Sequence, residues 1–561
     1  MKELKTLRQL IEDFTYEHLE HYVSLVAEGG EETVIHGVRA LDDPEKFTHG
    51  ALVNAATALF LRYKARGDGR AERTLALLNR FLDIVVENQV KTWGKLALLR
   101  AMAKLHKAGM LGVIPADKIE IIKEKTDYAD FFDKEKLAVR GYPTNYTQVA
   151  MACAGLRELL GWDSVPICAR ISEKLVDIMQ TSSDYGYMDE DMPMGRFDRY
   201  SILVSSEFSD TMQDVGGEMP APVLNNLAHS AKIALQMANE RGDGINYGRS
   251  LSCHGDGATL EVLSSAFARG LIDGADRDTA LLYCIRITEK ILNFWYDKER
   301  KSFNIWWDGR STNRYRQVHR VLEVNLDMAN HLLTTLANFE LAGLADTLPR
   351  INSLPCPEGW IATDLDFIAD GNSRARTVIL RHRDIMAMLP LIGIGKVYGN
   401  SAYQPYPAIC GVVEGAPEAR HPYLIPQYKC TDGSVFRPIQ FYTDIKTEQD
   451  CGAVTVTARG NLAKLGAQYP ERTEHSFTTV YRFEGNEISA SFETDLDYTE
   501  AQMTLGRHGE TAELLAFGFD SCKSETTEDV YDFLTPSGRI TEAQTYTATH
   551  KGTLSYRITL K

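Results

Sequence analysis

Residues 476–494 read SFTTVYRFEGNEISASFET, and this stretch decides the architecture of the C-terminal part of the chain. Its two arms, 476–483 and 487–494, alternate apolar or aromatic residues with polar ones, which is the period-two pattern of half-buried strands. Glu484-Gly-Asn between the arms is typical of a hairpin turn. The stretch therefore predicts an antiparallel β-hairpin.

The same alternation surrounds this hairpin. β-Branched and aromatic residues alternate with polar ones at 441–445, 453–458 and 553–560. Several short strands separated by turn residues indicate an antiparallel β-sandwich. We assign the sandwich to residues 396–561.

Upstream of this region, apolar residues recur every three to four positions, which is typical of amphipathic helices. Such segments span 50–66, 74–90, 93–109, 145–161, 165–181, 222–241, 257–271, 276–295 and 320–344. Helices of similar length joined by short loops, with no strands between them, indicate helix hairpins. No repeat of fixed period is present, which disfavours a solenoid. We therefore predict an (α/α) toroid over residues 1–395, followed by the sandwich, in a multidomain α and β chain.

The composition is that of an acidic globular protein. Of the 561 residues, 44% are hydrophobic, and 77 acidic residues outnumber 61 basic ones for a net charge of −16. This balance disfavours general nucleic-acid binding. No apolar run reaches the roughly 18 residues of a membrane span, and Met1-Lys-Glu-Leu-Lys does not begin a secretory signal.

The nine cysteines are dispersed, without C-x-x-C pairs or another metal-ligand spacing. An odd, dispersed set of thiols is typical of the reducing cytosol. We expect a cytoplasmic protein with no nucleic-acid or membrane partner, no cofactor and no metal ligands. Homo-oligomerisation is left open.

Three segments concentrate polar and aromatic residues between the predicted helices. The first, 188–201, is followed by further acids; it supplies Arg196, Asp198, Arg199 and Tyr200, with Glu207 and Asp210 after them. Arginine and tyrosine side chains could bind an anionic substrate. The alternative is a solvated loop and helix cap whose aspartates and arginines pair with each other.

The second segment, 244–257, reads GINYGRSLSCHGDG. Four glycines allow tight turns and close backbone approach, and between them stand Asn246, Tyr247, Arg249, His254 and Asp256. These are proton-transfer and anion-binding groups just before a helix N-terminus, where the dipole favours negative charge. The alternative is a structured turn in which the histidine and arginine satisfy helix ends.

The third segment, 303–320, carries two adjacent tryptophans and four arginines; its candidate binding residues are Trp306, Trp307, Arg314, Tyr315, Arg316 and His319. Arginine binds carboxylates through paired hydrogen bonds, and aromatic faces can stack on sugars. The alternative is an ion-pair network between helices.

A toroid followed by a sandwich resembles the polysaccharide lyases of the heparinase and alginate-lyase type. The Tyr247-Gly-Arg-Ser-Leu stretch also resembles an uncharacterised family of bacterial toroid proteins linked to that group. The resemblance implies a tyrosine acid/base, a histidine base or helper, and asparagine, histidine or arginine side chains that neutralise a uronate carboxylate. Tyr247, His254 and Arg249 match these roles, and Asn330-His331 is the nearest match to the Asn-His pair of such enzymes.

The leading hypothesis is therefore β-elimination on an anionic, uronic-acid-containing oligo- or polysaccharide. Tyr247, His254 and Arg249 are its catalytic residues, and Asn246 joins the substrate-binding set. A glycoside hydrolase is the first alternative, because Asp198, Glu207 and Asp256 could supply its two carboxylates. A non-catalytic glycan-binding protein is the second, based on Trp306 and Trp307.

Overall fold

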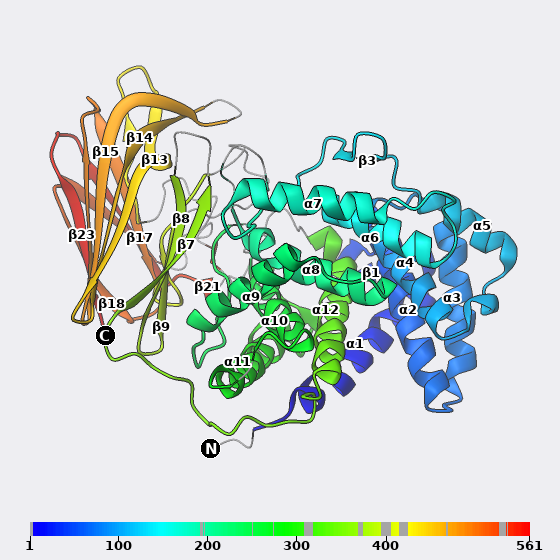
Figure 1. Ribbon diagram of the computed structural model, residues 1–561. Helices are drawn as coiled ribbons and strands as arrows, with labels where there is room; N and C mark the ends of the chain where they lie inside the picture. Colours follow the sequence, from blue (N-terminus) through cyan, green and yellow to red (C-terminus); the bar gives the residue numbers. More distant parts are fainter. Residues whose placement is uncertain are drawn as a thin grey trace.

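The structure is a computed structural model, and it has two parts: helices in the N-terminal portion and a large antiparallel sheet in the C-terminal portion (Figure 1). This arrangement confirms the predicted fold class. The structure describes residues 4–190, 195, 197–248, 251–272, 274–307, 318–368, 374–393, 406–414, 424–466, 469–526, 534–535 and 537–561.

The helical part contains the following helices in its described residues: α1 (Leu7–Gly29), α2 (Thr48–Ala65), α3 (Arg70–Glu87), α4 (Thr92–Lys107), α5 (Ala116–Lys125), α6 (Tyr146–Leu159), α7 (Cys168–Ser182), α8 (Arg199–Val215), α9 (Ala221–Gln236), α10 (Cys253–Ala268), α11 (Asp276–Lys290) and α12 (Val321–Leu341). Two-stranded β-hairpins stand in its loops: β1 (Val34–Ile35) with β2 (Val38–Arg39), β3 (Phe132–Asp133) with β4 (Ala138–Val139), and β5 (Tyr296–Asp297) with β6 (Ser302–Phe303). Among the described residues, no helix is both long and apolar enough to cross a bilayer.

Alternate helices form a closed inner ring. Helix α2 contacts α4, and the contacts continue through α6, α8 and α10 to α12, which returns to α2. Outside this ring, α3 packs on α2, α7 on α6, α9 on α8 and α10, and α1 on α12. Helix α10 is buried along nearly its whole length, as expected for an inner helix, and its polar side chains His254, Asp256 and Glu261 are buried with the apolar ones.

Close backbone approach joins the inner helices α2 and α4. A Cβ atom added to Gly50 of α2 would lie 1.9 Å from the carbonyl oxygen of Gly94 in α4. Only glycine fits where two helix backbones come this close. The pair therefore fixes how tightly this side of the ring closes.

The C-terminal part is a continuous antiparallel sheet whose strands are β7 (Ile361–Ile368), β8 (Arg374–His382), β9 (Ile385–Leu391), β10 (Ala408–Ile409), β11 (Val413–Glu414), β12 (Gln427–Lys429), β13 (Val435–Asp450), β14 (Ala453–Leu465), β15 (Glu471–Glu484), β16 (Glu487–Thr494), β17 (Glu500–Arg507), β18 (Ala512–Phe517), β19 (Ser521–Thr526), β22 (Glu542–Ala548) and β23 (Leu554–Leu560). The strand order is β18-β23-β16-β15-β14-β13-β12-β17-β11-β10-β9-β8-β7, with β22 pairing β17 and β19, and β8 also pairing β13. A separate pair joins β20 (Leu534–Thr535) to β21 (Gly538–Arg539).

The predicted hairpin is present as strands β15 and β16. Glu484 pairs with Glu487, so Gly485 and Asn486 form the turn, and Gly485 has the positive φ of 54° that such turns favour. This register places Phe477, Tyr481 and Phe483 on the buried side of β15. The alternation in the sequence thus reports which face of the strand is buried.

The sheet begins earlier in the chain than the predicted boundary at residue 396. Strands β7, β8 and β9 lie within 361–391, after α12 ends at Leu341. In β9 all residues from Met386 to Leu391 are buried. A strand covered on both faces lacks the polar alternation that identifies a half-buried strand, which explains the difference.

The two parts share one apolar core. The stacked rings of Phe197, just before α8, and Phe367 of β7 join them, with ring centroids 4.1 Å apart. Tyr187 packs edge-on against Phe367 from the helical side. The sandwich therefore packs directly against Tyr187 and against Phe197 just before α8.

Candidate active site

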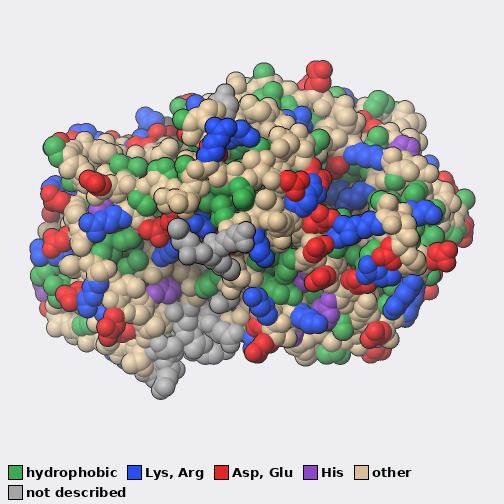
Figure 2. Space-filling view, turned by 90° about the horizontal axis from the view of Figure 1, so that it is seen from below, with side chains coloured by type: hydrophobic (Ala, Val, Ile, Leu, Met, Phe, Trp, Pro, Cys, Tyr) green, Lys and Arg blue, Asp and Glu red, His purple; other side chains and the backbone are tan. Residues whose placement is uncertain are grey.

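A cleft of about 440 Å³ occupies the centre of the helical ring. Every helix of the inner ring contributes to its wall, and α1 adds Glu12 and Tyr16. Figure 2 shows acidic and basic side chains gathered around a hollow on the helical half of the molecule. A concave site of this size that brings several polar side chains together is where proteins usually bind small molecules.

The first turn of α8 presents Arg199 and Tyr200 to the cleft. Asp198 caps this helix: its side chain accepts a hydrogen bond from the backbone N–H of Tyr200 at 2.8 Å. Arg199 Nη1 donates to the carbonyl oxygen of His254 and Nη2 donates to Tyr200 Oη, both at 3.0 Å. The cap and these two bonds fix the phenol in the cleft wall.

Helix α4 supplies two cations to the wall, Arg100 and Lys104, one turn apart. Lys104 Nζ donates to Asn54 Oδ1 at 2.9 Å, and Asn54 Nδ2 donates to Asn330 Oδ1 at 3.0 Å. Burial lowers the pKa of Lys104 to about 8. The side-chain amides of Asn54 and Asn330 therefore connect α4, α2 and α12. The lysine at the end of these hydrogen bonds loses its proton at a lower pH than an ordinary lysine.

Two carboxyls of α8, Glu207 and Asp210, face the cleft one turn apart. Burial raises the pKa of Glu207 to about 7, against the opposing effect of Arg199 and Arg100. Burial also raises the pKa of Asp210 to about 6, and the amide of Asn338 donates to its Oδ1 at 3.3 Å. Carboxyls protonated near neutral pH can serve as general acids.

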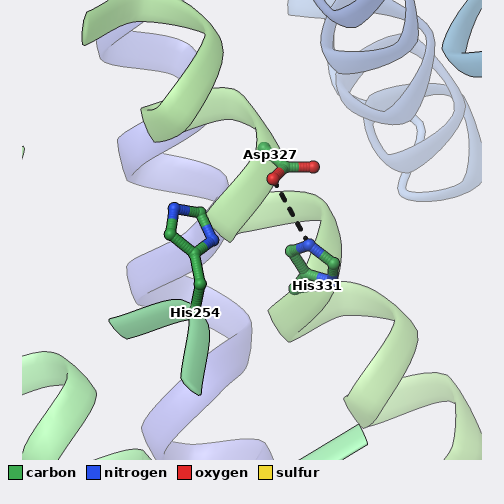
Figure 3. Close-up of side chains that lie close together, drawn as sticks. All are labelled: His254, Asp327 and His331. Carbon is green, nitrogen blue, oxygen red and sulfur yellow. Dashed lines mark ion pairs between the residues drawn. The ribbon is translucent and has the colours of Figure 1, made fainter. Parts of the chain in front are cut away.

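A cluster of His254, Asp327 and His331 also lies beside the cleft (Figure 3). One ligand atom from each residue lies within 4.8 Å of the other two. Glu261 contacts the Nδ1 of His331. Burial, aided by Arg199 and Arg100, lowers the pKa of His331 to about 3. These are the described side chains that could hold a metal ion.

The first predicted segment contributes most directly to the cleft. Arg199, Tyr200 and Glu207 line it, whereas Asp198 is the buried cap of α8. Arg196 lies outside the described residues. Residues predicted to form a loop therefore begin an inner helix instead, and this placement brings their side chains together.

The second predicted segment divides between two places. His254 joins the cluster with His331, and Arg249 lies outside the described residues. Tyr247 is fully buried and does not line the cleft in the described part of the chain. Burial also raises its pKa above the ordinary value.

Asn246 instead belongs to the junction between the two parts, and Asp256 belongs to a buried ionic cluster within the helical part. Asn246 Nδ2 donates to Glu414 Oε1 at 2.6 Å, and Glu414 also contacts His508 Nε2 at 2.8 Å. Asp256 accepts from the indole of Trp295 at 2.7 Å and pairs with Lys290 at 2.8 Å. These contacts hold neighbouring segments together, so they indicate a structural role for both side chains.

Apart from Arg320, the described residues of the third predicted segment do not line the cleft. Trp307 packs against His36 at a ring separation of 4.9 Å, and Trp306 meets it edge-on at 5.4 Å. His319 is half-buried. Arg314, Tyr315 and Arg316 lie outside the described residues, and Arg320 is the member of this stretch that lines the cleft.

Sequence reasoning missed several cleft residues: Asn54, Arg100, Lys104 and Glu261. Each is polar on a helix otherwise rich in apolar residues. The available signal was a polar or charged residue on the face that the hydrophobic pattern assigns to the interior. That signal identifies buried polar groups, but it does not indicate which helices bring them together.

The raised pKa of Glu207 predicts a measurable dependence of stability on pH. Between its ordinary pKa of 4.5 and about 7, the folded state holds a proton that the unfolded chain has released. Stability therefore falls as pH rises through this window. We expect Glu207→Gln to remove this fall, so the variant gains Tm relative to wild type from about pH 4 to about pH 8.

The matched control is Glu510→Gln, which changes an exposed glutamate. Its Tm should follow that of wild type at every pH. Parallel Tm curves for Glu207→Gln and wild type would contradict the raised pKa.

Comparisons with known proteins agree with the architecture. No protein-family model matches the chain, and neither does any curated protein. Among solved structures, the chondroitin AC lyase of Streptomyces coelicolor A3, in complex with chondroitin sulphate, is similar with a TM-score of 0.54 and 13% identity, over 99% of this chain and 79% of that one. Heparinase III is similar with a TM-score of 0.47 and 9% identity, over 98% and 84%. The chain thus shares the fold of a polysaccharide lyase.

Proposed function

We propose that this chain is a carbohydrate-active enzyme that cleaves uronic-acid-containing oligo- or polysaccharides by β-elimination. The observation that carries the proposal is the Tyr200 hydroxyl, which lines the cleft and accepts a hydrogen bond from Arg199 at 3.0 Å. A guanidinium donor stabilises the phenolate that removes a proton. The fold shared with a lyase crystallised with chondroitin sulphate supports this class of substrate.

Arg100 is our candidate for neutralising the uronate carboxylate. It lines the same cleft, and within the described residues it makes no hydrogen bond or ion pair. An arginine without a carboxylate partner has both of its donor edges available for a substrate carboxylate. Electrostatic stabilisation of the enolate that forms next to this carboxylate is the largest contribution expected in such a reaction.

The reaction then follows from these groups. The Tyr200 phenolate takes the proton from C5 of the uronate, and the electrons of that bond form a double bond between C4 and C5. The bond from C4 to the glycosidic oxygen breaks, and Tyr200 returns the proton to the leaving oxygen. The products are an unsaturated uronate end and a new sugar hydroxyl.

A product assay tests the proposal. The full chain is incubated with a panel of uronate-containing oligosaccharides, and both ultraviolet absorbance and new reducing ends are followed. Elimination gives one conjugated double bond for each reducing end. Reducing ends without the ultraviolet signal contradict the proposal, and binding without any product favours a non-catalytic glycan-binding protein.

Hydrolysis is the second candidate, because Glu207 is a cleft carboxyl with a pKa raised to about 7. It would protonate the leaving oxygen while Asp210 activates water. The other two acids considered for hydrolysis have different partners: Asp198 caps α8 and Asp256 pairs with Lys290. Glu207→Gln should lower the rate of hydrolysis by about 10²–10⁴-fold. The same variant should leave the rate of elimination through Tyr200 unchanged.

A further inference from the structure

We propose that His254, Asp327 and His331 form a binding site for one divalent transition-metal ion of the zinc class. Asp327 and His331 lie one turn apart on α12, and His254 comes from the first turn of α10. Figure 3 shows one ring nitrogen of His254 turned toward His331. Two histidines and one carboxylate are a usual ligand set for zinc and for other divalent transition metals.

The separations fit such an ion. Zinc bonds of 2.0–2.1 Å place two tetrahedral ligand atoms about 3.3–3.4 Å apart. His331 Nε2 and Asp327 Oδ2 are already 3.4 Å apart. The ligand atoms of all three residues lie within 4.8 Å of one another, so a small side-chain movement completes the set. No other such group of three occurs among the described residues.

Glu261 supplies the outer support that metal-binding histidines usually have. It contacts Nδ1 of His331, which leaves Nε2, the nitrogen near Asp327, to face the ion. A carboxylate that holds the second ring nitrogen sets the tautomer and orientation of the ligand. Glu261 is nearly buried, with 6% of its side chain exposed, so this contact is well shielded from water.

The site leaves room for a further ligand. His254 is buried, whereas 26% of the His331 side chain and 31% of the Asp327 side chain remain exposed beside the cleft. Three protein ligands with one open position are typical of zinc that binds water or substrate. The ion would also offset the carboxylates of Glu207 and Asp210 that share this cleft.

Metal binding to the full chain tests the proposal. Protein stripped with a chelator is titrated with Zn²⁺ by calorimetry, and Co²⁺ is added in parallel for absorption spectra. Wild type should bind one equivalent and show visible cobalt bands without the near-ultraviolet band of a cobalt–thiolate bond. Asp327→Asn and His331→Ala should lose this equivalent, and Glu261→Gln should weaken affinity by about 10–100-fold.

The matched control is His550→Ala, which removes an exposed histidine paired with Asp520 at 2.7 Å and should retain the equivalent. Circular dichroism checks that each variant is folded. If the α12 variants are not folded, the affinity of Glu261→Gln for the metal and the cobalt spectrum of wild type decide whether the site exists. A thiolate band, an unchanged equivalent in folded Asp327→Asn, or no binding by wild type would overturn the proposal. None of these outcomes depends on turnover, so they are independent of the proposed elimination.

Discussion

Tyr200→Phe is expected to lower kcat for β-elimination by about 10²–10⁴-fold, because the variant lacks the hydroxyl that carries the proton from C5 to the leaving oxygen. KM should change little, since the ring remains in the cleft wall beside Arg199. The measurement is the initial rate of ultraviolet absorbance with the best substrate of the panel. Wild-type turnover by the variant would contradict the assignment.

Tyr247→Phe is the opposing test. The Tyr247 side chain is fully buried and away from the cleft lining, so its loss should leave most of the turnover intact. If Tyr247→Phe abolishes elimination and Tyr200→Phe does not, the tyrosine expected from the Tyr247-Gly-Arg-Ser-Leu stretch is the catalytic one. Equal loss in both variants, with equal loss of Tm, would indicate damage to the fold.

Lys290→Met should destabilise the protein by about 3–5 kcal/mol, because it removes one partner of a buried ionic network. Lys290 Nζ lies 2.8 Å from both Asp243 and Asp256. Burial would lower the pKa of Lys290, but the two carboxylates raise it above its ordinary value. Without the ammonium group, the nearly buried carboxylate of Asp256 loses its cation, and Asp243 keeps only Arg241 as an ionic partner.

The loss of stability is measured by urea unfolding at neutral pH. Lys174→Met is the control, since Lys174 is exposed and pairs with Asp177 on the surface of α7; it should change the free energy of unfolding by less than about 0.5 kcal/mol. A similarly small effect of Lys290→Met would show that the network contributes little. Asp256→Asn should restore part of the stability of Lys290→Met, because it removes one of the two buried charges.

The sequence predicted many of the helices and strands whose burial is one-sided, although it missed α1, whose buried residues recur every three to four positions. Phe477, Tyr481 and Phe483 alternate with half-buried or exposed residues along β15, and that alternation is visible without a structure. The same alternation is absent from β9, where both faces are covered, so this strand was not predicted. The sequence pattern also failed for α8, in which Ser205, Ser206 and Ser209 are buried, because serine favours turns and caps over helix interiors.

The candidate site was less predictable than the fold. Arg199, Tyr200 and Glu207 were candidates because polar residues gathered near them in sequence. Their positions on the cleft depend on α8, which the pattern did not show. The neighbouring Asn246 and Asp256 had the same kind of signal, yet Asn246 bonds Glu414 of the sandwich and Asp256 pairs with Lys290 of α11.

By itself, the sequence determined that a helical toroid precedes an antiparallel sandwich, because periodicity is a property of residues a few positions apart. Only the tertiary structure decided which side chains share the cleft. Asn54 and Asn330 are 276 residues apart in sequence and hydrogen-bonded in the ring. Closing the ring brings such residues together, and no local pattern records a contact between helices so distant in the chain.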